Sequence, residues 1–241
     1  MKILAIDTSN RPLSVALLED QTLLAENTTA VGRNHSVALM PLVDNIFKQS
    51  SLTPAQIDRI VVAQGPGSYT GLRIGITTAK TLAYSLDKEL VGVSSLAVLA
   101  AGVQDVNSVI VPVFDARRGN VFAGGYVWQN GQLVNRISDQ HISFAALCRQ
   151  LPDRQVCFVG ADAQRFEAEM KQNLTPGTYR IGGAETLVPR AFNLGQLGRF
   201  ADPVNVNDFV PNYLRLTQAE TQWLAQNPKE KDNNGAYVKK I

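Results

Sequence analysis

The sequence predicts an α/β protein made of two related lobes. Short apolar runs separated by polar turns indicate strands, and longer apolar stretches between them indicate helices. The order strand, strand, strand, helix, strand, helix occurs twice, and each copy opens on an apolar strand that ends in an aspartate, Asp7 and then Asp115. We therefore expect a first lobe over residues 1–104, a second over 105–217, and a polar, mobile tail over 218–241.

In the first copy, three short strands joined by polar turns predict an antiparallel meander. A helix, a buried strand, a glycine-rich loop and a second helix follow. The expected elements are strands 3–6, 15–18 and 23–26, a helix from about residue 36, strand 60–63 and helix 70–86.

The second copy repeats this order, and its Asn130-Gly131 pair predicts a hairpin turn. The expected elements are strands 109–114, 121–128 and 133–137, helix 144–151, strand 156–159, and helices 166–171 and 186–200.

Composition narrows the class of protein. The 241 residues carry a net charge of +2, and up to Gln226 the basic and acidic residues balance, which lowers the expectation of a protein that binds nucleic acid by itself. Cys148 and Cys157 are too few for a disulfide framework. An acid at position 7 interrupts any signal peptide, and no apolar run approaches the roughly 20 residues that span a bilayer, so we expect a cytoplasmic protein away from membranes.

A glycine-rich stretch covers residues 64–75, between an expected strand and an expected helix. Backbone amides at a helix start favour an anion there. The spacing matches neither the phosphate loop of nucleotide hydrolases nor the dinucleotide fingerprint. The favoured interpretation is a tight turn, in which Gly71 and Gly75 permit close packing of the helix.

Asp7, Thr8 and Ser9 follow the first strand. A carboxylate and two hydroxyls there could hold a metal–phosphate unit, or cap a turn, and the sequence leaves both open. His35 and His141 are the only histidines, so a zinc hydrolase is not expected. No nucleophile elbow of a serine hydrolase is present.

The first helix is apolar nearly all round. Leu39, Val43, Ile46 and Phe47 form one stripe, and Val37, Ala38 and Met40 widen it, while Pro41 bends the helix or delays its start. Such a helix needs a second cover besides its own sheet. A larger core or a subunit contact would supply it, and we favour the contact.

Five motifs together resemble the TsaB family, also called YeaZ, up to about residue 217. They are Ile3-Leu4-Ala5-Ile6-Asp7-Thr8-Ser9, His35-Ser36 before a Leu/Met-Pro helix, the stretch from Gly65 to Gly75, Asp115-Ala116-Arg117-Arg118-Gly119, and Pro211-Asn212-Tyr213-Leu214-Arg215. The glycine-rich motif is the most specific of them.

This resemblance implies two ribonuclease-H-like lobes in the actin-like, Hsp70-like (ASKHA) arrangement. It also implies a subunit of the machinery that forms N6-threonylcarbamoyladenosine at position 37 of tRNAs reading ANN codons. Such a subunit pairs with its catalytic relative TsaD, works with the ATPase TsaE, and meets tRNA only through the complex. Threonylcarbamoyl-adenylate is supplied by TsaC.

The catalytic relative carries His-x-x-x-His for its metal on the first helix. Here His35 stands at the first place but Leu39 at the second, so we expect no catalytic residue, metal or cofactor in this subunit, with ATP and a metal ion belonging to its partners. The resemblance places the partner contact on the two first-lobe helices, and the chain alone could form a homodimer. The expected interface residues are Leu39, Met40, Val43, Ile46, Phe47, Ile74 and Thr78.

We expect burial of the apolar stripe to supply most of the association energy, so that Val43→Asp would abolish pairing. Asp7, Thr8, Ser9, Arg117 and Arg118 form a possible vestigial nucleotide or phosphate region. Two alternatives remain open: an ATP-dependent small-molecule kinase of the same superfamily, which would use Asp7 and the turn near Asp115, and, less favoured, a metallopeptidase acting on glycoproteins.

Overall fold

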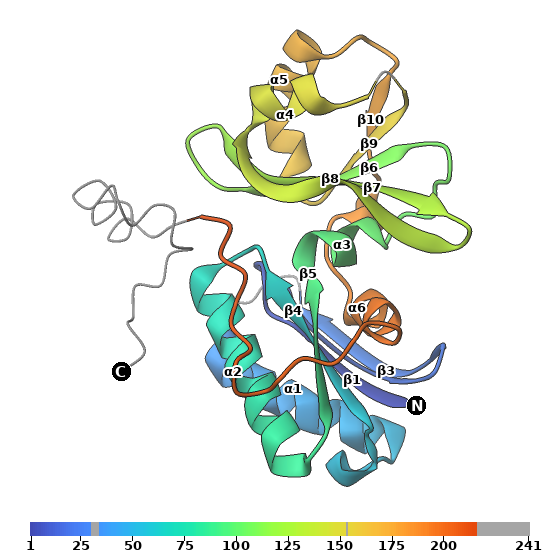
Figure 1. Cartoon of the computed structure of the whole chain (residues 1–241), viewed down its shortest axis with the longest axis vertical. Helices are drawn as coiled ribbons and strands as arrows, with labels where there is room; N and C mark the ends of the chain where they lie inside the picture. Colours follow the sequence, from blue (N-terminus) through green and yellow to red (C-terminus); the bar gives the residue numbers. More distant parts are fainter. Residues whose placement is uncertain (30–33, 153, 216–241) are drawn as a thin grey trace, which may run out of the picture.

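The structure is a computed structural model that describes residues 1–29, 34–152 and 154–215. Two lobes lie one above the other, each built on a five-stranded sheet (Figure 1). The expected tail, 218–241, and the last two residues of the expected second lobe lie outside the described residues. Within these ranges, no helix combines the length and apolar character needed to cross a membrane.

The first sheet has the order β3-β2-β1-β4-β5. Strands β1 (Lys2–Asp7), β2 (Leu13–Glu19) and β3 (Thr22–Thr29) form the expected antiparallel meander, and β4 (Arg59–Gly65) and β5 (Glu89–Ser94) run parallel to β1. Successive β1 residues face opposite cores. Leu4 and Ile6 pack with α1 (His35–Ser50) and α2 (Tyr69–Leu86), whereas Ile3 and Ala5 pack with α6 (Ala191–Gly198).

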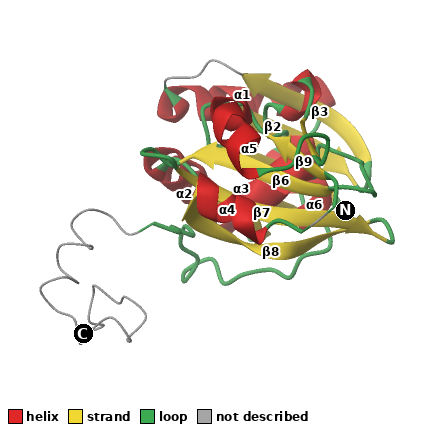
Figure 2. Ribbon diagram, turned by 90° about the horizontal axis from the view of Figure 1, so that it is seen from above, coloured by secondary structure: helices red, strands yellow, loops and turns green. Residues whose placement is uncertain are grey.

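The second sheet repeats this arrangement in the order β10-β9-β6-β7-β8. Its strands are β6 (Val109–Asp115), β7 (Asn120–Gln129), β8 (Gln132–Ser143), β9 (Val156–Val159) and β10 (Tyr179–Ile181). Helices α4 (Phe144–Gln150) and α5 (Glu167–Asn173) cover one face (Figure 2), and α3 (Ser95–Ala100) packs against the other, between the lobes. The expected pair of ribonuclease-H-like lobes is confirmed.

The structure corrects several elements. Strand β5, helix α3 and strand β10 were not expected, because β5 passes directly into the short α3 and β10 has three residues. The expected helix 186–200 divides into the 3-10 turn η3 (Ala184–Thr186) and α6, because Pro189 between them has no amide hydrogen to donate. Two further 3-10 turns are η1 (Pro54–Gln56) and η2 (Ala163–Phe166).

The end of the described chain returns to the first lobe. Helix α6, expected in the second lobe, packs against β1 and β2, and residues 199–212 run along β5 and α2 (Figure 1). Buried Arg59 anchors this return, since its Nη1 lies within 3.0 Å of the carbonyl oxygens of residues 198, 199 and 201. The first lobe therefore takes segments from both parts of the chain, and the division at residue 104 stays a prediction about folding units.

Candidate functional site

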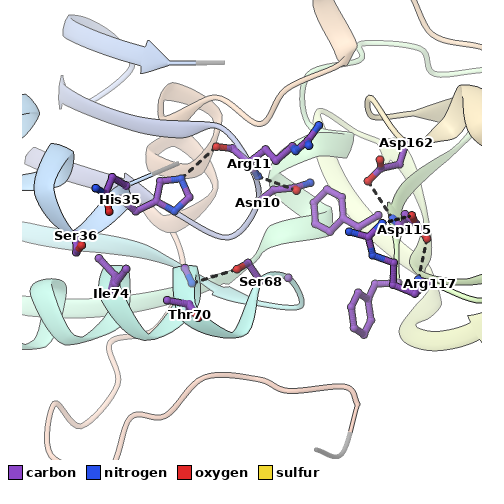
Figure 3. Close-up of a pocket in the computed structure, with 15 residues that line it drawn as sticks. Asn10, Arg11, His35, Ser36, Ser68, Thr70, Ile74, Asp115, Arg117 and Asp162 are labelled. Atoms are coloured by element: carbon purple, nitrogen blue, oxygen red, sulfur yellow. Dashed lines mark hydrogen bonds and ion pairs between the residues drawn. The ribbon is translucent and has the colours of Figure 1, made fainter. Parts of the chain in front are cut away.

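A cleft of about 510 Å³ opens between the two lobes. The first lobe contributes the turn after β1, the start of α1 and the loop before α2, and the second contributes the β6–β7 turn and Asp162 (Figure 3). A neighbouring hollow of about 310 Å³ shares Gly67, Asp115, Arg117 and Phe122 with it. The two hollows therefore form one continuous depression.

The turn after β1 packs directly on the glycine-rich stretch. Thr8 Oγ1 donates a 2.7 Å hydrogen bond to the carbonyl of Gly71, and the amide of Ser68 donates one of 2.7 Å to the carbonyl of Ser9. A Cβ at Gly71 would lie 2.1 Å from the backbone oxygen of Thr8, and one at Gly75 would lie 2.2 Å from Thr8 Oγ1. These glycines are needed because α2 passes against the backbone of this turn.

Three amides at the start of α2 have partners inside the protein. Besides the Ser68 amide, the Gly71 amide donates to the side chain of Ser68, which caps the helix, and the Leu72 amide donates to the Ser68 carbonyl. A phosphate cradle needs such amides free to face the ligand. These three hydrogen bonds fit the turn interpretation.

Asp7 is a buried carboxyl group, with 1% of the residue exposed. Its Oδ1 accepts hydrogen bonds from the amide and hydroxyl of Ser9, while its Oδ2 is buried without a hydrogen-bond partner in the structure. Burial raises the pKa of Asp7, against the lowering effect of the Ser9 hydrogen bonds. Asp7 does not line the cleft, because its carboxyl group lies behind the cleft wall.

The second-lobe side of the cleft is a network of charges. Asp115 Oδ2 lies 3.2 Å from Arg165 Nη1 and 3.5 Å from Arg117 Nη1, and the Asp115 amide donates to Asp162. Arg117 and Arg118 occupy the β6–β7 turn with φ of +71° and +54°. Both side chains are exposed.

The structure divides the expected phosphate region. Arg117 lines the cleft, and Arg118 follows it in the same turn, whereas Asp7, Thr8 and Ser9 are buried behind the cleft wall. The first-lobe side of the opening is formed instead by the next two residues, Asn10 and Arg11 (Figure 3). Their position in a polar turn gave no sign in the sequence of a role at the cleft, and the same holds for Asp162 and Phe122.

At the second place of the His-x-x-x-His motif this chain has Leu39, and that side chain lies in the core. His35 Nε2 lies 3.1 Å from the carbonyl oxygen of Arg11, and Leu39, one turn later, is 1% exposed and packs under the sheet. A leucine offers no ligand atom, so this pair does not fit a metal. In the part of the chain that the structure describes, no three histidine, cysteine, aspartate or glutamate side chains come together as a metal group.

The expected partner contact needs a correction. Leu39, Val43, Ile46 and Phe47 are all buried in the core of their own lobe, because α1 lies across β2 and β3 with this stripe facing inward. They are therefore not free to supply most of an association energy, and Val43→Asp would disturb the fold itself. Met40 is 47% exposed, and Ile74 and Thr78 are partly exposed.

An open groove of about 330 Å³ nevertheless lies between α1 and α2. Met40 and the inner residues Val43 and Phe47 line it on one side, and Leu82 and Leu86 line it on the other. Val37 is also exposed near the start of α1. The apolar surface available on this face is thus narrower than the sequence predicted, and it lies along the α1–α2 pair.

A second polar cluster joins the lobes, and the sequence did not predict it. Asp139 of β8 accepts hydrogen bonds from Ser94, at the end of β5, and from Tyr126 of β7. Burial raises the pKa of Asp139, and burial beside this acid also raises the pKa of Tyr126. The cluster lies where β5 enters α3, so its first role is to hold the second sheet against the first lobe.

The chain is similar to known proteins both in sequence and in fold. Residues 24–223 match the family model described as TsaD, tRNA N6-adenosine threonylcarbamoyltransferase. The tRNA threonylcarbamoyladenosine biosynthesis protein TsaB of Bacillus subtilis is 43% identical over 226 residues, which are 93% of this chain and 98% of that protein. The protein of the same name from Escherichia coli is 31% identical over 89% of this chain and 95% of its own length. The structure of YeaZ from Pseudomonas aeruginosa superposes with a TM-score of 0.78 at 25% identity, over 88% of this chain and 99% of that one.

Proposed function

Because the chain belongs to the TsaB family of tRNA threonylcarbamoyladenosine biosynthesis proteins, we propose that it is a non-catalytic subunit of the complex that forms N6-threonylcarbamoyladenosine at position 37 of tRNAs reading ANN codons. In this proposal the chain pairs with TsaD, works with TsaE and acts in the cytoplasm. ATP and the metal ion belong to those partners.

One observation carries the non-catalytic part of the proposal. The residue four positions after His35 is Leu39, and its side chain is enclosed by the core of the first lobe. The place of a second metal ligand is therefore filled by packing. The carboxyl group of Asp7 is buried behind the cleft wall and does not line the cleft.

The α1–α2 face supports the pairing part. Met40 and Val37 are large apolar side chains exposed on a helix surface, and the groove beside Met40 has an apolar floor. Covering such a surface removes apolar area from water, which favours association by about 25 cal/mol for each Å² buried. The same surface explains how two copies of the chain could associate when TsaD is absent.

Reconstitution tests the function. Purified TsaC, TsaD and TsaE from the same source are mixed with unmodified tRNA, ATP, threonine and bicarbonate, with and without this chain. Threonylcarbamoyl incorporation should depend on the chain. Equal incorporation in its absence, or turnover by the chain alone, would contradict the proposal.

A substitution on the exposed surface tests the contact. Met40→Asp places a charge where the partner would bury it, and this should weaken TsaD binding by at least a hundredfold in calorimetry, with little change in melting temperature. Gln49→Asp is the matched control, because it adds the same charge at another exposed position of α1. Equal affinities of the two variants would show that TsaD binds elsewhere.

The kinase alternative predicts tight nucleotide binding by the isolated chain. A titration with Mg-ATP is the direct test, and micromolar affinity would favour that alternative. A metal analysis of the purified chain tests the metallopeptidase alternative in the same way.

A further inference from the structure

The opening of the interlobe depression is surrounded by arginines. Six of them, which we call the arginine rim, come from five separate parts of the chain: Arg11, Arg73, Arg117, Arg118, Arg165 and Arg215. Arg11 and Arg117 line the cleft, Arg117 and Arg215 line the neighbouring hollow, and Arg165 pairs with Asp115 between them. Folding thus collects on one surface cations that are scattered in the sequence.

This surface is more basic than the chain as a whole. Two carboxylates, Asp115 and Asp162, lie among the six arginines, whereas acidic and basic residues balance over the first 226 residues. The excess positive charge on the rim is therefore offset by negative charge elsewhere on the molecule. Such a local excess creates a field that attracts a polyanion even when the net charge is small.

The arginines keep donors for a ligand. A guanidinium group has five N–H donors. Arg215 directs Nη1 to the carbonyl of Ala116 at 3.3 Å, and Arg73 directs Nη1 to the hydroxyl of Tyr69 at 2.6 Å. Arg117 is 76% exposed on its side chain and meets Asp115 only at 3.5 Å. These contacts orient the side chains and leave N–H groups for the bidentate geometry that phosphate accepts.

An aromatic stack lies within the rim. The rings of Tyr69 and Tyr213 stack with centroids 4.9 Å apart and planes 26° apart, and the Arg73 guanidinium lies 5.3 Å from the centre of the Tyr69 ring. Both tyrosines line the hollow beside the cleft and are partly exposed. Aromatic rings beside arginines are the surface on which unpaired nucleic-acid bases stack.

We propose that the arginine rim binds the sugar–phosphate backbone of the tRNA in the complex with TsaD, with the Tyr69–Tyr213 stack beside an unpaired base. This inference rests on the proposed function. The rim extends across both lobes, which suits a chain of phosphates better than one phosphate group, and its aromatic stack suits a nucleic acid better than an acidic protein. None of its arginines lines the α1–α2 groove.

The test uses the complex of this chain with TsaD and a fluorescent, unmodified transcript of a tRNA that reads an ANN codon. The rim variant carries Arg117→Gln, Arg118→Gln and Arg215→Gln. The matched control carries Arg136→Gln, Arg149→Gln and Arg154→Gln, three exposed arginines of the second lobe outside the rim. Both variants lose the same charge, and melting curves and TsaD pull-down establish that each is folded and paired.

We expect the rim variant to raise the Kd for tRNA at least tenfold at 100 mM salt, with the control within twofold of the native complex. The slope of log Kd against log salt should decrease by about two to three, since each of the three lost phosphate contacts contributes roughly 0.7–0.9. Unchanged tRNA affinity of the rim variant, or an equal loss of affinity in both variants, would overturn the proposal that the arginine rim binds tRNA. Incorporation of threonylcarbamoyl by the native complex is measured in parallel, and its independence from the chain would overturn the proposed function separately.

Discussion

Replacing Gly71 with alanine distinguishes a packing role of the glycine-rich stretch from a ligand-binding role. The new Cβ would lie 2.1 Å from the backbone oxygen of Thr8, and ordinary contact begins at 3.4 Å, so the turn and α2 would have to separate by roughly 1.3 Å. The 2.7 Å hydrogen bond from Thr8 Oγ1 to the Gly71 carbonyl stretches with this movement. The Thr8 oxygen belongs to the backbone, so it cannot move away as the end of a flexible side chain could.

The energies can be compared. Forcing atoms into a packed interior costs about 1–3 kcal/mol, and loss of the hydrogen bond adds about 1 kcal/mol. Alanine within a helix is more favourable than glycine by about 1 kcal/mol, which offsets part of this loss. The net loss is therefore about 1–3 kcal/mol, which for a chain of this size lowers the melting temperature by roughly 2–12 °C.

Thermal unfolding followed by circular dichroism measures this change. Thr81→Ala is the matched control, because it places alanine at an exposed position of the same helix and should leave the melting temperature within about 1 °C. A Gly71→Ala protein that melts at or above the native temperature would refute the packing argument. A loss confined to ligand binding, with native stability, would favour the phosphate-loop interpretation instead.

Three further changes test the same reasoning about burial. Because burial raises the pKa of Asp7 above its ordinary 3.8, the folded protein holds a proton that the unfolded chain releases, and this carboxyl's contribution to the free energy of unfolding falls as pH rises from about 4. The melting temperature of the Asp7→Asn variant should therefore rise relative to that of the native protein between pH 4 and 7. A difference between the two melting temperatures that stays constant over this range would contradict the raised pKa. Leu39→His restores the two-histidine spacing but places a polar ring in the core. We therefore expect the free energy of unfolding, measured with denaturant, to fall by roughly 3 kcal/mol, and calorimetry to show no Zn²⁺ binding. Stoichiometric zinc binding would refute this view of the site. Arg59→Leu leaves three carbonyl groups at the end of α6 without their donor, and urea unfolding should show a loss of about 3–5 kcal/mol, in contrast to a loss below 1 kcal/mol for the exposed Arg136→Leu.

The correction at α1 shows how partner surfaces are misread from sequence. The apolar stripe through Leu39 and Val43 is what any helix needs to pack on its own sheet, and a wider stripe indicates additional apolar surface for a partner. In the structure the stripe is buried in the first-lobe core, and the large apolar side chains of this helix that stay exposed are Val37 and Met40. Periodicity shows which face of a helix is apolar. How much of that face is buried depends on how far the sheet extends beneath it.

The arginine rim is a complementary case. Charge counting lowered the expectation of a nucleic-acid surface, because the count averages over the whole molecule. Arg11, Arg117 and Arg215 are far apart in the sequence, and they reach one depression because the β1 turn, the β6–β7 turn and the returning end of the chain meet there. No local pattern in the sequence predicts that these three segments lie side by side.

The sequence by itself determined much of the local structure of this protein: the strands of both lobes other than β5 and β10, the two long helices, the Asn130-Gly131 turn and the repeated order of elements. Each of these follows from side-chain periodicity and turn geometry over a few residues. Only the tertiary structure decided that α6 covers the first sheet, that Gly71 lies against Thr8 and that Asp7 is enclosed behind the cleft. Those outcomes depend on which distant surfaces exclude water together, and that is a property of the packed chain rather than of any segment of it.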